Sequence, residues 1–136
     1  MTALTSKATL LLALVLILAG CKETHTTDAS ESYYLWSGKK PESDLKIIHG
    51  DYKQTSGPVK EYTLFMELQA SADWRNNFIN LNELAVDDDE WSIPADAPAW
   101  FKPDNTYKVW KQPQPFAESI YFEDTTSGKM FIYEVD

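Results

Sequence analysis

The sequence predicts an α+β fold in a single small domain, with an antiparallel sheet of about five strands, one short helix and a proline-rich crossover. Three observations lead to this prediction. Residues 59–69 alternate between apolar and polar side chains, residues 71–84 repeat with a helical period, and residues 119–135 hold two apolar runs around a glycine-bearing loop. No internal repeat or second domain is apparent, so we expect one globular body over residues 33–136.

The composition is acidic and almost free of cysteine. The 136 residues include 12 Lys and Arg against 21 Asp and Glu, which gives a net charge of −9. A negative surface repels nucleic-acid phosphates and anionic bilayers, so we expect no nucleic-acid partner and a domain that does not lie flat on lipid. It suits a basic partner instead. Cys21 has no second cysteine with which to form a disulfide, so the core alone must hold the fold.

The N-terminal residues have the three zones of a secretory signal. A short polar start precedes an apolar run over residues 8–17, and the sequence Leu18-Ala19-Gly20-Cys21 follows. The apolar run is only about half as long as the roughly 20 residues that a membrane-spanning helix needs. We therefore expect residues 1–20 to be a signal peptide that is removed, which takes away Lys7 and changes the net charge from −9 to −10.

The tetrapeptide Leu18-Ala19-Gly20-Cys21 resembles the lipobox of bacterial lipoproteins. The resemblance covers residues 1–21 and implies that Cys21 receives a diacylglycerol group, that cleavage occurs before it, and that the new amine is acylated. Two or more acyl chains hold a protein firmly, because each buried CH₂ contributes about 0.8 kcal/mol.

The same resemblance implies a place in the cell. It makes the chain a lipid-anchored envelope protein whose membrane partner is reached through Cys21. In the family's sorting rule an Asp after the cysteine favours the inner membrane. Lys22 stands there in this chain, which implies the periplasmic face of the outer membrane.

Residues 21–32 are expected to be the lipidated cysteine followed by a flexible polar tether, because they are rich in Ser, Thr and charge and lack an apolar period. His25 lies in this segment, where a solvated side chain is a simpler interpretation than a metal ligand.

The folded body is expected to begin with an aromatic strand over residues 33–36. Residues 44–49 fit either a short strand or a helical turn.

Turns are predicted at Gly50-Asp51 and at Ser56-Gly57-Pro58. The strand that follows, 59–69, has one apolar face, formed by Tyr62, Leu64, Met66 and Leu68.

The helix over residues 71–84 begins with an N-cap candidate, Ser71, and places three apolar residues on one face. These residues are Trp74, Phe78 and Leu81. The acidic run 87–90 then ends the helix. We interpret this run as a solvated loop, because it lacks the alternating acids that aim oxygens at a bound calcium ion.

Residues 91–103 contain three prolines, which exclude a central strand or a helix interior. A rigid segment of this kind can present aromatic anchors, so Trp91, Trp100 and Phe101 are the candidate binding surface. The alternative is that the segment folds back over the sheet and that its aromatic side chains belong to the core. Both interpretations remain open at this point.

Alternation returns over residues 106–111, and the prolines of residues 112–115 interrupt it. Residues 119–123 and 129–135 are predicted to form a hairpin around the loop 124–128. Apolar side chains occur on both faces of this hairpin, so we expect it to be covered in part on both sides.

Neither a catalytic residue nor a metal or cofactor site can be assigned from the sequence. His49 is the only histidine of the expected body, and the chain lacks the Gly-x-Ser-x-Gly motif of serine hydrolases. We therefore expect a non-enzymatic envelope lipoprotein that binds a protein or envelope component. The alternative is an immunity or inhibitor lipoprotein that neutralises a basic toxin or enzyme in the periplasm, which the acidic charge would suit.

Overall fold

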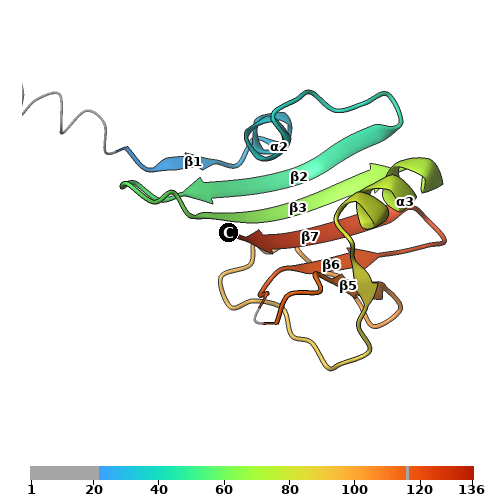
Figure 1. Cartoon of the computed structure of the whole chain (residues 1–136). Helices are drawn as coiled ribbons and strands as arrows, with labels where there is room; N and C mark the ends of the chain where they lie inside the picture. Colours follow the sequence, from blue (N-terminus) through green and yellow to red (C-terminus); the bar gives the residue numbers. More distant parts are fainter. Residues whose placement is uncertain (1–21, 116) are drawn as a thin grey trace, which may run out of the picture.

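The computed structural model describes residues 22–115 and 117–136, so the expected signal peptide and the tetrapeptide Leu18-Ala19-Gly20-Cys21 lie outside the described residues. The domain is a small α+β fold with a seven-stranded antiparallel sheet of order β1-β2-β3-β7-β6-β5-β4 and two helices (Figure 1). The strands are β1 (Thr24–Thr26), β2 (Leu45–Gln54), β3 (Tyr62–Ala70), β4 (Ala85–Val86), β5 (Lys108–Lys111), β6 (Ile120–Glu123) and β7 (Lys129–Val135), and the helices are α2 (Ala29–Ser37) and α3 (Ala72–Leu81).

The predicted fold class is confirmed, and the predicted numbers of strands and helices are wrong. Two strands that were not predicted lie at the edges of the sheet: β1, with three residues, and β4, with two. Such short strands carry too little alternation to be recognised as a sequence pattern.

The flexible tether expected over residues 21–32 is wrong for most of its length. Thr24–Thr26 pair with the end of β2, and α2 begins at Ala29. The Asp28 carboxylate caps this helix by accepting a hydrogen bond from the Glu31 backbone N–H at 2.8 Å. His25, expected to be a solvated linker residue, lies with its Nε2 3.0 Å from Asp51 Oδ1.

The strand expected over residues 33–36 is also wrong, because these residues form the last turns of α2. The helix ends at Gly38, whose φ of 76° is the left-handed conformation that glycine adopts without strain. Its backbone N–H donates to the Tyr34 carbonyl. Capping at both ends therefore overrides the strand propensity of the aromatic run.

The turn predicted at Gly50-Asp51 is wrong, because β2 continues through both residues. A β-bulge between Ile47 and His49 changes which residues face the helices, and this irregularity explains why residues 44–49 fit no single period. Gly50 is required because α2 crosses here: a Cβ at this position would lie 2.6 Å from Ser32 Cβ. The predicted turn at Ser56-Gly57-Pro58 is confirmed, since residues 55–61 connect β2 to β3.

The sheet has an apolar core on each face. One cluster lies under the two helices, and its buried members include Tyr33, Leu64, Met66, Leu68, Tyr121, Met130 and Ile132. The other lies on the opposite face and consists of Phe65, Phe101, Val109, Phe122 and Phe131. Alternating residues of β3, β6 and β7 enter the two clusters, as expected for strands that are covered on both faces.

The proline-rich segment covers the face opposite the helices. Phe101 packs edge-to-face against Phe65 and Phe131, with ring centroids 5.2 and 5.3 Å apart. The segment leads into β5, and the chain returns through the predicted hairpin of β6 and β7, which is confirmed. The resulting order of layers is helices, sheet and irregular cover (Figure 1).

We predict that Gly50→Ala destabilises the domain by about 2 kcal/mol, because the added methyl group overpacks the contact between α2 and β2. The cost should fall by at least half in a Ser32→Gly background, where the side chain that meets the new methyl group is absent. Urea unfolding of the four proteins in this double-mutant cycle measures the coupling. Equal costs of Gly50→Ala in both backgrounds would contradict the close approach.

Candidate binding groove

The structure brings the three residues that the sequence nominates as a binding surface to one aromatic cluster on the sheet, where they differ in burial. Phe101 is only 1% exposed and belongs to the core, so it is not a surface residue. Trp91 is half-buried against Phe122, at a centroid distance of 4.7 Å, and Trp100 is half-buried against the His49 ring at 4.9 Å. The segment therefore packs on the sheet, because the aromatic face of β6 and β7 must be covered.

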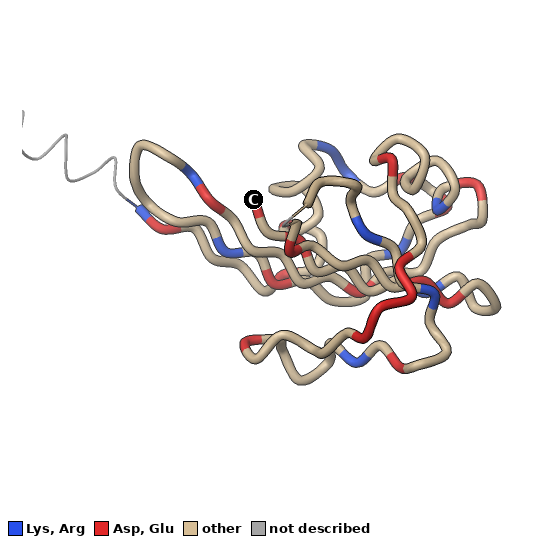
Figure 2. The backbone as a smooth tube through the Cα atoms, turned by 60° about the horizontal axis from the view of Figure 1, so that its bottom comes forward, with Lys and Arg blue, Asp and Glu red and all other residues tan. Residues whose placement is uncertain are grey.

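The acidic run 87–90 is a loop, visible as the longest continuous acidic stretch of the backbone (Figure 2). Asp87 Oδ2 lies 2.5 Å from Lys111 Nζ, and this hydrogen bond holds the pKa of Asp87 below its ordinary value. Within residues 22–115 and 117–136, no group of three or more His, Cys, Asp or Glu side chains is placed to hold a metal ion.

His49 belongs to a polar cluster on the face covered by the proline-rich segment. Its Nδ1 lies 2.9 Å from Glu67 Oε2, and the other oxygen of Glu67 lies 3.1 Å from Lys129 Nζ. Glu67 is buried and Trp100 stacks on the imidazole. The buried carboxylate thus holds two basic groups of neighbouring strands.

A concave surface lies on the other face of the sheet, between α2 and α3. This groove has a volume of about 570 Å³. Aromatic side chains from both helices and from β3 line it, namely Tyr33, Trp36, Tyr62, Trp74 and Phe78. Four carboxylates and one ammonium group also line it, those of Glu42, Asp44, Asp73, Glu134 and Lys39.

Helical spacing in α3 builds one wall of the groove. Ser71 caps the helix as predicted, because its Oγ accepts a hydrogen bond from the Trp74 backbone N–H at 3.1 Å. Trp74 and Phe78 are four residues apart and stack at 5.3 Å with an interplanar angle of 6°. Phe78 then reaches across to Trp36 of α2 at 5.8 Å.

Leu81 shares one face of α3 with Trp74 and Phe78, as predicted, because all three residues line the groove. Arg75 and Ile79 occupy the buried positions, which turns the core-facing side of the helix away from Leu81. Leu81 is 84% exposed and lies at the groove. A large apolar side chain is thus left in solvent beside an aromatic surface.

Glu134, near the end of β7, is the polar centre of the groove. Its Oε1 accepts hydrogen bonds from Trp36 Nε1 at 2.8 Å and from the Tyr62 hydroxyl at 2.5 Å. Its Oε2 accepts one from the Tyr121 hydroxyl at 2.6 Å. Burial, followed by the nearby Glu134 charge, raises the pKa of both tyrosines, so these hydroxyls remain protonated donors.

A second carboxylate of the groove is neutralised within the chain. Glu42 Oε1 lies 2.5 Å from Lys39 Nζ, and Glu42 Oε2 accepts the Tyr33 hydroxyl at 3.0 Å. The hydrogen bond from Lys39 is the main cause that lowers the pKa of Glu42 to about 2. Burial is the main cause that raises the pKa of Tyr33 to about 12.

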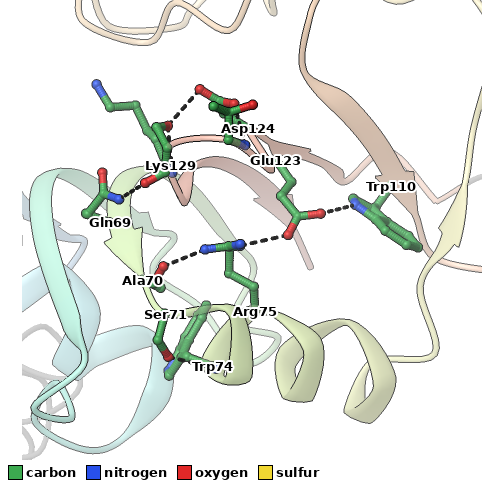
Figure 3. A network of polar contacts seen from close by, with 11 residues as sticks. Gln69, Ala70, Ser71, Trp74, Arg75, Trp110, Glu123, Asp124 and Lys129 are labelled. Atoms are coloured by element: carbon green, nitrogen blue, oxygen red, sulfur yellow. Dashed lines mark hydrogen bonds and ion pairs between the residues drawn. The ribbon is translucent and has the colours of Figure 1, made fainter.

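A buried ion pair fixes α3 against the sheet (Figure 3). Arg75 Nε donates to Glu123 Oε2 at 2.8 Å, and Arg75 Nη1 donates to the Ala70 carbonyl at 2.6 Å. The side chains of Arg75 and Glu123 are 10% and 6% exposed, and Trp110 Nε1 donates to the second Glu123 oxygen. This network joins the groove-forming helix to β3, β5 and β6.

Comparison with family models, with curated proteins and with solved structures found no match in any of the three searches. No helix in the part of the chain that the structure describes has the length and apolar character needed to cross a bilayer.

The groove can therefore bind by packing and charge. Its aromatic walls offer apolar contact area and ring faces, and its carboxylates offer hydrogen-bond acceptors and negative potential. The sequence marks Trp74 and Phe78 by their helical spacing. It does not mark Trp36 or Glu134 as their neighbours, because these residues come from distant parts of the chain.

We predict that Glu123→Gln destabilises the domain by about 3 kcal/mol, because it leaves the Arg75 charge buried without a counter-ion. The free energy of unfolding from urea denaturation measures this cost. Asp88→Asn, a matched acid-to-amide change at an exposed site, should shift the same quantity by less than about 0.5 kcal/mol. A similar small shift for Glu123→Gln would show that the ion pair does not secure α3.

Proposed function

We propose that this chain is a lipid-anchored, non-enzymatic envelope lipoprotein whose acidic domain binds a protein or envelope component through the α2–α3 groove. The observation that carries the proposal is the groove itself, which combines an aromatic lining, an exposed leucine and an excess of carboxylates. Binding sites commonly combine an apolar wall with a few convergent polar groups.

The anchor follows from Leu18-Ala19-Gly20-Cys21, and Lys22 after the cysteine favours the periplasmic face of the outer membrane. The start of β1 at Thr24 leaves only Lys22 and Glu23 between the lipidated residue and the sheet. A domain attached in this way stays close to the lipid surface, where its negative charge would keep it from lying against anionic headgroups.

The partner is expected to carry positive charge. Removal of the signal peptide gives a net charge of −10, and the groove holds four carboxylates against one ammonium group. Complementary charge speeds association and selects partners. An immunity or inhibitor role against a basic toxin or enzyme uses the same groove and differs only in the identity of the partner.

No catalytic role is proposed. The chain has two histidines, His25 at the edge of the sheet and His49 in β2. His49 pairs with Glu67, and its ring stacks with that of Trp100. The His49 side chain is 48% exposed, and no hydroxyl or thiol nucleophile is among these partners.

We predict that Cys21→Ser abolishes membrane attachment, because the thiol that receives the lipid is lost. Metabolic labelling with a radioactive fatty acid and fractionation of membranes measure the effect, and the unchanged chain should carry label and sediment with membranes. Continued labelling and sedimentation of the Cys21→Ser protein would contradict lipid anchoring at this residue.

We predict that a photo-reactive phenylalanine analogue placed at Leu81 forms a specific cross-linked product in intact cells, because Leu81 is exposed at the groove. The same analogue at Val59 is the matched control, since Val59 is 73% exposed and lies outside the groove lining. Immunoblotting reveals the products. Identical products from both positions, or none from Leu81, would contradict binding through the groove.

A further inference from the structure

We infer that the groove receives a lysine or arginine side chain from a basic peptide segment of a partner protein, and that this cation binds at Glu134. The inference rests on the proposed function, because it assigns the ligand class of the same groove.

The first observation is the hydrogen bonding of the Glu134 carboxylate. An ionised carboxylate has about four acceptor positions. Two donors bind Oε1, from Trp36 and Tyr62, and one donor binds Oε2, from Tyr121. One acceptor position therefore remains on Oε2, on a side chain that is rigidly held by three donors and lines the groove.

The second observation is that this charge has no counter-ion among the residues that the structure describes. All three donors to Glu134 are neutral groups, and among residues 22–115 and 117–136 no Lys, Arg or His side chain forms an ion pair with it. Half-buried carboxylates are favoured beside an opposite charge. The one ammonium group of the groove, that of Lys39, already pairs with Glu42.

The third observation is the aromatic surface around this carboxylate. Trp36 both donates to Glu134 and lines the groove, and Tyr62 does the same. These rings present their N–H and O–H groups to the carboxylate, and their apolar surface offers a place for the aliphatic stem of a lysine or arginine to pack. The site therefore matches a cation on an apolar stem better than a small hydrated ion.

The dimensions of the groove point to a peptide. Its volume of about 570 Å³ exceeds what one side chain fills, and Leu81 supplies exposed apolar surface beside it. Asp73, also exposed, adds a further carboxylate on the α3 side. Neighbouring apolar and basic residues of a peptide segment would contact these two side chains once the central cation is bound at Glu134.

The test uses the full-length lipidated protein in detergent micelles and a short peptide of alternating lysine and leucine, with a control peptide in which every lysine is acetylated. Isothermal calorimetry measures the dissociation constants. Acetylation removes the charge and keeps most of the stem, so we expect it to weaken binding at least about tenfold. Equal affinities of the two peptides would overturn the inference.

Two variants locate the cation. Glu134→Gln should weaken binding of the lysine peptide about tenfold, whereas Glu90→Gln, the same change on the exposed acidic loop, should weaken it less than about twofold. Asp73→Asn removes an exposed groove carboxylate in the first turn of α3 and should weaken binding about threefold. It serves as the second variant if Glu134→Gln does not fold. Equal losses in Glu90→Gln and in the groove variants would show non-specific charge attraction and overturn the inference.

The outcomes separate this inference from the proposed function. If the lysine peptide does not bind while the Leu81 cross-link persists in cells, the groove has a partner and the cationic ligand is wrong. If a chitin oligosaccharide binds the groove and Glu134→Gln leaves its affinity unchanged, the ligand is a sugar and the inference is again overturned. If the peptide binds as expected and Glu134→Gln also abolishes the Leu81 cross-link, the partner in the cell uses the same cation.

Discussion

Burial of the sheet on both faces is the constraint on which the rest of the structure depends. The central strands β3 and β7 send alternate residues into two apolar clusters, so neither face tolerates solvent. The helices cover one face, and the proline-rich segment covers the other. Because a single cysteine cannot form a disulfide within the chain, these two layers must be held by packing and by polar contacts such as the Arg75–Glu123 ion pair.

The same constraint produces the groove. Two short helices cannot cover a sheet face completely, and the space between α2 and α3 is lined by the aromatic residues that continue the core toward solvent. The Arg75–Glu123 ion pair holds α3 in place, and the close approach at Gly50 holds α2. These contacts outside the groove fix its two helical walls, and contacts within it, such as those of Trp36 with Glu134 and Phe78, hold its lining.

The sequence predicted the elements that local patterns describe. Strict alternation identified β3, the Ser71 cap and the Trp74–Phe78 spacing identified α3, and a glycine-bearing loop between apolar runs identified the hairpin of β6 and β7. Helix α2 also has a local signal, Asp28 followed three residues later by Glu31, but the aromatic run that follows was interpreted as a strand. The capping residues Asp28 and Gly38 favour a helix and the aromatic run favours a strand, and the segment forms a helix.

The groove and the cover of the second face could not be predicted in this way, because both depend on contacts between distant residues. Glu134 and Trp36 are 98 positions apart in the sequence, and only the folded sheet brings them into contact. Trp91, Trp100 and Phe101 had two interpretations because a rigid aromatic segment fits either a surface or a core. Phe101 lies in the core because the opposing phenylalanines of β3, β6 and β7 require a partner.

The lengths of the strands have a consequence for behaviour in a crowded layer. The long strands β2, β3 and β7 lie inside the sheet, and its two edges are the three-residue β1 and the two-residue β4. Strand β1 pairs with β2 only at Tyr52, Lys53 and Gln54, so the outer side of β2 over residues 45–51 has no strand partner in the described part of the chain, and α2 packs against β2 instead. Each edge strand itself therefore offers little backbone for pairing with a second copy, and strand addition at the β2 edge would have to take place beside α2.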